Sequence, residues 1–244
     1  MREDGVMQVK KFSDIDLNDP FFDTLKSSYA EFSDWFVRKG EEVAYTVYDS
    51  NSSLQGFLYI KGENGPIRDI TPPINASRVL KVGTFKINAH RTKLGERFVK
   101  KIFDYAIEWR VSPIYVTVFQ EHVGLISLLR NYGFRQYGVK TTPNGSELVF
   151  LKDFISLTGN ITFDYPIINA SANKWVLGVK PEYHTRLFPD SILRTEDSKI
   201  ISDISHTNSI YKVYIGRALD MPRIRIGDTL VIYRPGEQRL SKWY

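Results

Sequence analysis

The residues best suited to hold a charged ligand form a basic, glycine-containing turn in front of a helix-like stretch. The turn spans residues 90–97 and contains Arg91, Lys93 and Gly95. N–H groups at the start of a helix point outward, and the helix macrodipole favours an anion there. The turn is therefore a candidate site for a diphosphate. A solvated basic loop is the alternative explanation of the same charges.

Groups that could move protons lie on both sides of that helix-like stretch. An imidazole titrates near neutral pH, which makes His90 and His122 candidate bases. Glu121 is a further candidate because it follows the end of a strand-like run, and the hydroxyl of Tyr132 is a candidate acid. Each of the first three is alternatively a surface or capping residue. For Tyr132 we favour packing against a sheet, as amphipathic aromatic residues near helix ends commonly do.

The segments around the turn are the elements that must position these groups. Residues 81–87 alternate in the manner of a half-buried strand. After the turn, apolar residues recur at spacings that place them on one helical face: Phe98, Ile102, Ala106 and Trp109. Residues 113–119 are predicted to form the next strand. Residues 122–134 are predicted to form a short helix that ends in Tyr132-Gly133-Phe134.

Elements on both sides extend this pattern. Residues 19–39 are expected to form one or two helices, with Asp19 as cap, Pro20 in the first turn and an aromatic stripe typical of a core. Hairpins are expected from strands 43–48 with 54–61 and from strands 137–142 with 147–151. Strands interleaved with helices in this order predict an α/β domain, with a mixed central sheet flanked by helices.

The order of strand, basic turn, helix, strand and helix resembles the acetyl-CoA core of the GNAT superfamily of N-acetyltransferases. In that family the turn carries [Gln/Arg]-x-x-Gly-x-[Gly/Ala]. Gly95 matches the last small position, while Lys93 stands where the first Gly usually lies and His90 at the Gln/Arg position. The 122–134 segment is similar to the family's Asn-x-x-Ala-x-x-x-Tyr-x-x-x-Gly-Phe helix, with the Gly-Phe ending intact. The likeness extends, more weakly, over residues 14–154.

The resemblance implies a place for acetyl-CoA as cosubstrate. In the family the central strand splays from its neighbour, and its backbone N–H groups meet the acetyl and pantetheine groups; here that strand is residues 84–87. The diphosphate would lie on the backbone of the turn. The helices of the 19–39 segment would border the acceptor cleft. The implied cosubstrate-binding residues are Phe85, Lys86, Ile87, Arg91, Thr92, Lys93, Leu94, Gly95, Glu96 and His122.

The last helix departs from the family pattern at three positions. Counting back from Phe134, the Tyr that can protonate the leaving thiolate falls on Leu129, the Asn on His122 and the Ala on Leu125. Tyr132 lies three residues after Leu129, on about the same helical face, and could take over as acid. The candidate catalytic residues are thus Glu121, His122 and Tyr132.

The sequence changes character after Thr158-Gly159-Asn160, which predicts two domains, 1–157 and 158–244. Short strands are expected at 174–179, 212–216 and 228–234. The last of these, with Gly227-Asp228 at its entry, resembles a strand of PUA-like and ASCH-type small β-barrels. Because more strands normally follow in those folds, we expect a truncated chain or a reduced barrel completed by the first domain. In such a domain, the nearby Tyr and Arg residues would suit RNA, with an ordinary β surface as the alternative.

Composition narrows the remaining classes. The 244 residues carry a net charge of +5 and no Cys, which excludes disulfides, thiolate metal sites and Cys nucleophiles. The four His residues are not at ligand spacing, so no metal site is expected. No run is long enough for a transmembrane helix and no signal peptide begins the chain, so we expect a cytoplasmic protein.

Together these features predict an enzyme. We expect an acetyl-CoA-dependent N-acetyltransferase whose amine acceptor is unidentified and lies on a nucleic acid or a protein partner. The alternative is a non-catalytic module that uses the same core for acyl-CoA sensing, with nucleic acid bound through the C-terminal part. Leu129 separates the two, because an enzyme needs another source of the proton for the thiolate and a binding module does not.

Overall fold

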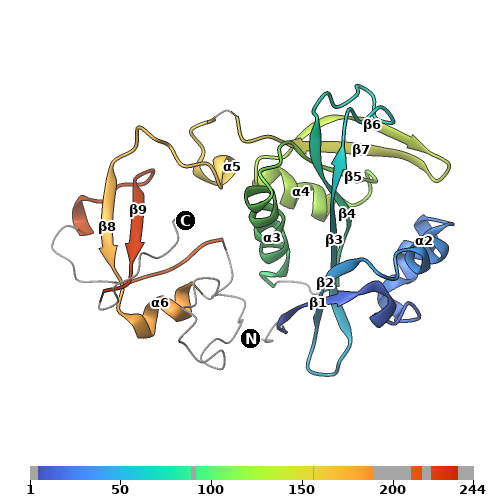
Figure 1. Cartoon of the computed structure of the whole chain (residues 1–244), viewed down its shortest axis with the longest axis horizontal. Coiled ribbons are helices and arrows are strands. Elements are labelled where there is room, and N and C mark those ends of the chain that lie inside the picture. The colour runs from blue at the N-terminus through green and yellow to red at the C-terminus, as the bar shows by residue number, and fades with distance from the viewer. Residues whose placement is uncertain (1–4, 89–91, 156, 189–209, 216–220, 236–244) are drawn as a thin grey trace.

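The central sheet occupies residues 7–152 of the computed structural model, which describes residues 5–88, 92–155, 157–188, 210–215 and 221–235. Seven strands follow the order β1-β2-β3-β4-β5-β7-β6 (Figure 1). Their bounds are β1 Met7–Lys11, β2 Val43–Tyr48, β3 Leu54–Asn64, β4 Arg78–Ile87, β5 Ile114–Val118, β6 Arg135–Thr142 and β7 Gly145–Lys152. Within this sheet β4 and β5 pair in parallel and the other neighbours are antiparallel. The expected mixed α/β sheet is confirmed.

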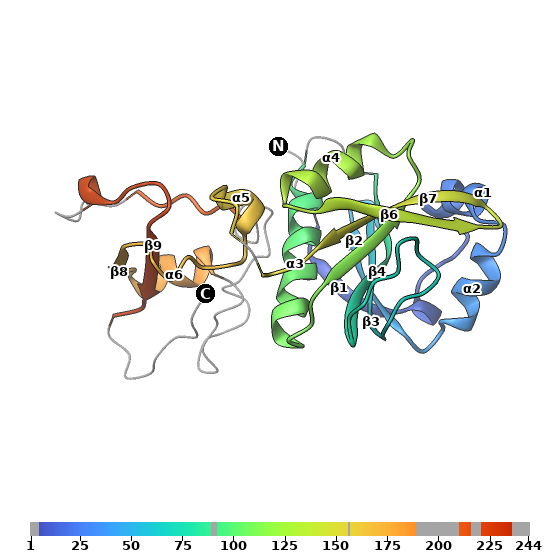
Figure 2. The ribbon, with the colours of Figure 1, turned by 90° about the horizontal axis from the view of Figure 1, so that it is seen from above.

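Helices cover both faces of the sheet. Figure 2 shows α3 (Leu94–Glu108) and α4 (Val123–Asn131) on one face, with α1 (Asp23–Ser28) and α2 (Phe32–Arg38) on the other. The apolar stripe of α3 packs in one buried cluster with residues of β4, β5 and α4. A second cluster joins the aromatic residues of the 12–36 segment to β2 and β3. The sheet therefore separates two cores, and the helices on each face follow the predicted apolar stripes.

The aromatic stripe near the N-terminus forms a core, as expected. The Asp19 carboxylate accepts a hydrogen bond from the N–H of Phe21 at 2.8 Å, and Pro20 opens a short 3₁₀ helix that leads into α1. Phe22 and Phe36 are buried against Phe57 of β3. This packing holds α1 and α2 against the sheet beside the ends of β4 and β5.

The edge strand β1 is not predicted by the sequence pattern. It pairs antiparallel with β2, from Met7 opposite Val47 to Lys11 opposite Val43. The strand is short and mostly solvent-exposed, so its side chains carry only a weak alternation. Its place is decided by pairing with β2, which local periodicity does not reveal.

The C-terminal part forms a second, smaller sheet. Strands β8 (Lys174–Gly178) and β9 (Thr229–Tyr233) pair in parallel, accompanied by α5 (Ile161–Asp164), α6 (Pro181–Leu187) and a 3₁₀ helix at Met221–Arg223. Two of the three expected strands form, whereas residues 211–215 are not in a strand and residue 216 lies outside the described ranges. Two strands do not make a barrel, so the described residues do not support the PUA-like expectation, nor the RNA partner inferred from it.

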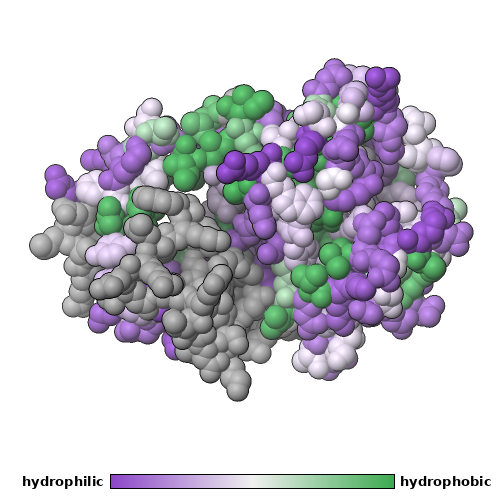
Figure 3. All heavy atoms as spheres, viewed as in Figure 1, coloured by the Kyte–Doolittle hydropathy of each residue, from purple (hydrophilic) through white to green (hydrophobic). Residues whose placement is uncertain are grey.

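Apolar side chains gather on the surface over the segment around α5 (Figure 3). The exposed apolar residues of that segment are Ile155, Leu157, Ile161, Phe163 and Ile168.

In the part of the chain that the structure describes, no helix is both long and apolar enough to cross a lipid bilayer.

Candidate active site

The parallel pairing of β4 with β5 stops at the point where the acetyl site is expected to begin. Its last pair joins Val82 to Val116. Beyond it, β4 continues to Ile87 beside β3 alone, while β5 continues beside β7. A gap therefore opens between two strands that are neighbours in the same sheet, as the resemblance implies for residues 84–87.

A β-bulge at Gly83 lies where this gap begins. Val82 pairs with Ile60 and Thr84 pairs with Tyr59, so Gly83 is the extra residue on β4. A bulge changes which backbone groups face each neighbouring strand. A Cβ atom at Gly83 would lie 2.6 Å from Cδ1 of Tyr59, a distance that real Cβ contacts do not reach. The bulge thus requires glycine because the Tyr59 ring lies against it.

The direction of the N–H groups beyond the bulge follows from their neighbours. The N–H of Asn88 donates to the carbonyl of Gln55, near the start of β3, at 2.9 Å. Since N–H groups alternate in direction along an antiparallel strand, those of Phe85 and Ile87 face away from β3, into the gap. Both residues are among those that the resemblance implies for binding the cosubstrate.

A cleft of about 260 Å³ lies at the gap. Its walls come from β4 and β5, from the start of α4, from the 25–35 segment that covers the second face of the sheet, and from the hairpin of β6 and β7. Elements far apart in the sequence therefore meet around the unpaired edge of β4. Val82, Thr84 and Phe85 line the cleft from that strand.

A buried carboxylate faces the cleft from β7. Glu147 is only 5% exposed, and its Oε1 accepts a hydrogen bond from the hydroxyl of Tyr29 at 2.7 Å. Burial is the larger cause that raises the pKa of the Tyr29 phenol, and this carboxylate raises it further. The phenol therefore keeps its proton and remains the donor. Glu147 does not stand out in the sequence because it begins an ordinary-looking predicted strand. Its partner Tyr29 lies on another element, and no local pattern connects the two.

A second contact closes the same side of the cleft. The side-chain amide of Asn144 donates to both carboxylate oxygens of Glu31, at 2.9 and 2.8 Å. That donation lowers the pKa of the Glu31 carboxyl, so Glu31 stays charged near neutral pH. The pair ties the loop before α2 to the turn between β6 and β7.

The three expected catalytic residues are not brought together. His122 lines the cleft and precedes α4, where its side chain makes no capping hydrogen bond. Glu121 is exposed and does not line the cleft. Tyr132 is 3% exposed and does not line it either. His122 is therefore the expected catalytic residue that the fold places at the gap.

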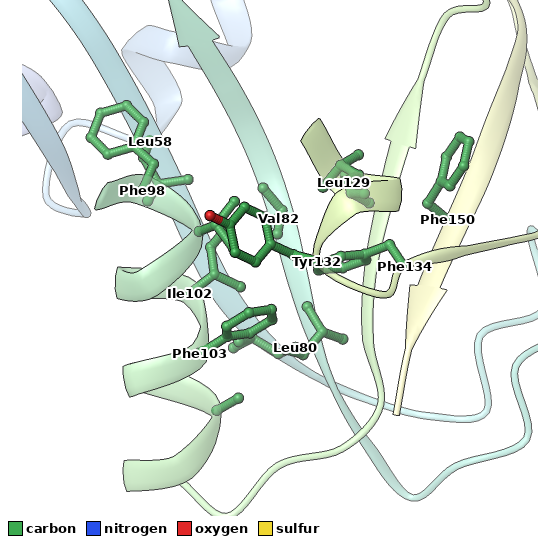
Figure 4. Packing of buried hydrophobic residues seen from close by; sticks show 14 of the residues in the cluster. Leu58, Leu80, Val82, Phe98, Ile102, Phe103, Leu129, Tyr132, Phe134 and Phe150 are labelled. Carbon is green, nitrogen blue, oxygen red and sulfur yellow. The ribbon is translucent and has the colours of Figure 1, made fainter. Parts of the chain in front are cut away.

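Tyr132 instead belongs to the core between α3 and α4. Figure 4 shows its ring beside Val82, Phe98 and Ile102. Burial, and then the carboxylate of Glu96, raise the pKa of its hydroxyl. This arrangement agrees with the packing interpretation of Tyr132. Leu129, at the position of the family's acid, is fully buried in the same cluster.

The basic turn leads into α3 as expected, although His90 and Arg91 lie outside the described residues. Lys93 is the residue before the first turn of α3 and forms an ion pair with Glu96 at 2.8 Å. The hydroxyl of Thr92 accepts a hydrogen bond from the N–H of Leu94 at 3.3 Å. The remaining first-turn N–H groups of a helix lack acceptors within the helix and are available to an anion.

Gly95 has a packing role in addition to the one expected of it. A Cβ atom at this position would lie 2.9 Å from Cδ2 of Leu128 on α4. The absence of a side chain therefore lets the start of α3 approach α4 closely.

Within the described ranges, no cluster of three or more His, Asp and Glu side chains is arranged to hold a metal ion.

No protein-family model and no curated protein sequence matches the chain. Among solved structures, it is similar to a GNAT-family acetyltransferase from Streptococcus agalactiae, with 14% identity, 62% of this chain and 96% of that chain covered, and a TM-score of 0.46. The IAA acetyltransferase from Bacillus cereus shares 13% identity over 61% of this chain and 98% of that chain, with a TM-score of 0.45.

A third similar structure is NAA60 from Arabidopsis thaliana, in complex with acetyl-CoA. It shares 13% identity over 61% of this chain and 98% of that chain, with a TM-score of 0.42. All three TM-scores lie below 0.5, so these likenesses establish neither the activity nor the acceptor of this chain.

Proposed function

We propose that the chain transfers an acetyl group from acetyl-CoA to an amine. The observation that carries this proposal is the parting of β4 from β5 at the Gly83 bulge, which turns the N–H groups of Phe85 and Ile87 into a gap that opens on the cleft. Acyl transfer needs donors aimed at the developing oxyanion and a place for the nucleophile beside the carbonyl. The gap supplies the donors and the cleft supplies the place.

The start of α3 is the proposed site of the diphosphate. The backbone from Thr92 to Glu96, together with Lys93 and with Arg91 outside the described ranges, would surround the phosphates. The residues present fit such a group, because first-turn N–H groups and the helix macrodipole favour an anion. Phe85, Lys86 and Ile87 would lie along the pantetheine arm, and His122 would lie near the thioester.

Glu147 is the proposed base. The acceptor nitrogen attacks the thioester carbonyl carbon, a C–N bond forms, the C–S bond breaks, and the amine loses one proton. The carboxylate of Glu147 lies in the cleft wall and can take up that proton, while Tyr29 holds it in place. The leaving thiolate takes a proton from solvent, because Leu129 has none to give and Tyr132 is buried away from the cleft.

Two measurements test the proposal. Calorimetric titration should show acetyl-CoA binding, and Gly95→Asp should bind it more weakly than Gly95→Asn, a neutral side chain of the same size. At about 4 Å in water, one carboxylate and one phosphate charge repel by about 1 kcal/mol, so we expect at least about fivefold weaker binding. Asp and Asn crowd Leu128 equally, so the difference between them isolates the charge.

Transfer itself can be followed by thiol release. The chain has no Cys, so every thiol that appears during the reaction comes from coenzyme A. Thiol release that depends on both acetyl-CoA and an added amine would support the proposal. Equal acetyl-CoA affinity of the Asp and Asn variants would remove the diphosphate site, and acetyl-CoA binding without any amine-dependent thiol release would leave only the acyl-CoA-sensing alternative.

A further inference from the structure

We propose that the cleft accepts a small zwitterionic amine, a molecule that carries a carboxylate or a phosphate in addition to its amine, and that Lys81 binds the anionic group. Lys61 supports Lys81 at the same end of the cleft, and Lys140 lines the cleft from β6, directly opposite Glu147. The inference rests on the proposed function and extends it by assigning the chemical class of the acceptor amine.

The first observation is that three lysines line the cleft while the carboxylates of their ion pairs do not. Lys61 pairs with Glu63 at 2.6 Å, and Lys140 pairs with Asp69 at 2.6 Å. The three side chains Lys61, Lys81 and Lys140 contribute to the lining, and neither Glu63 nor Asp69 does. A ligand in the cleft therefore meets the ammonium groups, with the compensating carboxylates outside the lining.

The second observation is that Lys81 has no carboxylate within ion-pair distance in the described part of the chain. It lies half-buried over the ring of Tyr115, with Nζ 5.6 Å from the ring centre. Burial lowers the pKa of Lys81; Glu63 and Asp69 act to raise it, and Lys140 and Lys61 to lower it. Lys61 and Lys140 each have a carboxylate within ion-pair distance, whereas Lys81 has none among the described side chains.

The third observation concerns strand register. Lys61 and Lys81 are direct cross-strand partners on β3 and β4. Like charges placed directly opposite each other destabilise a sheet. A ligand anion between them would remove this repulsion and supply the acceptor that Lys81 lacks. A neutral or cationic ligand group at the same place would leave the repulsion or increase it.

The carboxylate of Glu147 lies along the sheet from Lys61 and Lys81, with Lys140 opposite it on β6. Tyr115, the partner of Lys81 on β5, pairs with Leu151 of β7, and Glu147 lies four residues further along that strand, about 13 Å away at the usual rise per residue. An amine beside Glu147 and an anion beside Lys81 would therefore match the polarity of the cleft. A diamine would instead place its second cation against the lysines.

Four probe amines of similar chain length test this inference: butylamine, γ-aminobutyrate, aminopropylphosphonate and putrescine. Binding is measured by calorimetry on the full chain, with and without acetyl-CoA, and transfer is measured by thiol release. We expect γ-aminobutyrate or aminopropylphosphonate to bind at least about tenfold more tightly than butylamine, with putrescine the weakest. The order of the first two distinguishes a carboxylate from a phosphate as the preferred group.

Three variants locate the effect. Lys81→Met keeps the aliphatic stem and should abolish the preference for the anionic probes over butylamine. Lys81→Arg should restore most of that preference because it restores the charge. Lys101→Met is the matched control, since Lys101 also lies over a tyrosine ring, 5.4 Å from the ring centre of Tyr45, but on α3 and outside the cleft.

The inference is overturned if wild type binds butylamine as tightly as the anionic probes, if it binds none of the four, or if Lys81→Met keeps the preference. These outcomes differ from a failure of the proposed function. Thiol release without any preference for anionic amines contradicts the lysine site alone. Tight binding of an anionic probe without acetyl-CoA binding contradicts the acetyl transfer alone.

Discussion

At the scale of single residues, the hydrogen bond between Tyr29 and Glu147 is the contact with the clearest chemical consequence. It joins a loop before α2 to the start of β7 and holds a carboxylate in the wall of the cleft. A buried carboxylate needs hydrogen-bond donors, and Tyr29 is such a donor. Glu147 is thereby oriented toward the same cleft as the unpaired edge of β4.

Replacing Glu147 tests its role as base. Glu147→Gln keeps the size and the hydrogen bond from Tyr29 but removes the ability to take up a proton. We expect the turnover number to fall by about a hundredfold or more, the usual contribution of a general base, with acetyl-CoA affinity unchanged. Steady-state thiol release and calorimetry measure the two quantities. Glu108→Gln, an exposed residue at the end of α3, is the control. Turnover of Glu147→Gln equal to that of the control would remove Glu147 from the reaction.

Tyr132 carries the hydroxyl that could replace the acid missing at Leu129, although packing is the interpretation that the structure favours. The hydroxyl lies within the core and outside the cleft, so we expect Tyr132→Phe to leave turnover unchanged and to cost at most about 1 kcal/mol of stability. Thermal unfolding and thiol release measure the two effects. A tenfold loss of turnover, about 1.4 kcal/mol of barrier, would show instead that the hydroxyl acts as the acid.

At the scale of elements, a single lysine connects α4, β7 and α5. Lys152 is 3% exposed, and its ammonium donates to the carbonyl of Tyr132 at 2.9 Å and to that of Phe163 at 2.6 Å. Burial lowers the pKa of Lys152 to about 8, and the carboxylates of Asp164 and Asp153 oppose this lowering. The end of α4 and the whole of α5 are therefore held by a group that titrates in an accessible pH range.

This predicts an unusual pH dependence of stability. Between about pH 8 and pH 10 the unfolded chain, with a lysine pKa near 10.4, binds more protons than the folded chain at Lys152. The free energy of unfolding should therefore rise with pH in this window, by about 2 kcal/mol from this group. Above about pH 10 the buried tyrosines, whose pKa values are raised, reverse the trend as unfolded tyrosines lose protons.

Denaturant unfolding at several pH values measures the effect, and Lys152→Met identifies the group. The variant should be less stable throughout, because two carbonyl acceptors lose their donor, but its stability should rise less between pH 8 and pH 10. Parallel curves for wild type and variant would contradict the assignment to Lys152.

At the scale of the whole molecule, the boundary between the two sheets is held more firmly than the sequence suggests. The carboxylate of Asp164 accepts hydrogen bonds from the N–H and the hydroxyl of Thr158 at 2.7 Å each, and from the N–H of Gly159 at 2.9 Å. Tyr165 packs against Phe103 of α3, with ring centres 5.7 Å apart. The residues that the sequence marks as a junction are therefore hydrogen-bonded to α5, and the residue after α5 packs against α3.

Limited proteolysis of the full chain tests this arrangement. Hydrogen-bonded, packed backbone resists proteases, so we expect the first stable N-terminal fragment to extend beyond Tyr165 instead of ending at 157. Mass spectrometry of the early fragments gives the site of cleavage. A dominant early cut within Thr158-Gly159-Asn160 would restore the boundary expected from composition.

Much of the first unit is determined by local sequence pattern. Strand β2 forms over the predicted residues, and α3, β5 and the hairpin of β6 and β7 form within a few residues of prediction. Periodicity, caps and turn residues act over a few positions, which a single sequence displays. The mixed sheet and the strand beside the expected acetyl site follow from the order of these elements.

Tertiary structure alone decided the contents of the cleft. The pairing of Tyr29 with Glu147, the placement of Lys61 opposite Lys81, and the burial of Tyr132 join positions that no local pattern relates. Register and packing set which side chains share a face of the sheet. A shift of one residue in strand pairing would turn each side chain of that strand to the opposite face. The sequence by itself therefore predicts a binding scaffold, whereas the three-dimensional arrangement selects the residues that line its cleft.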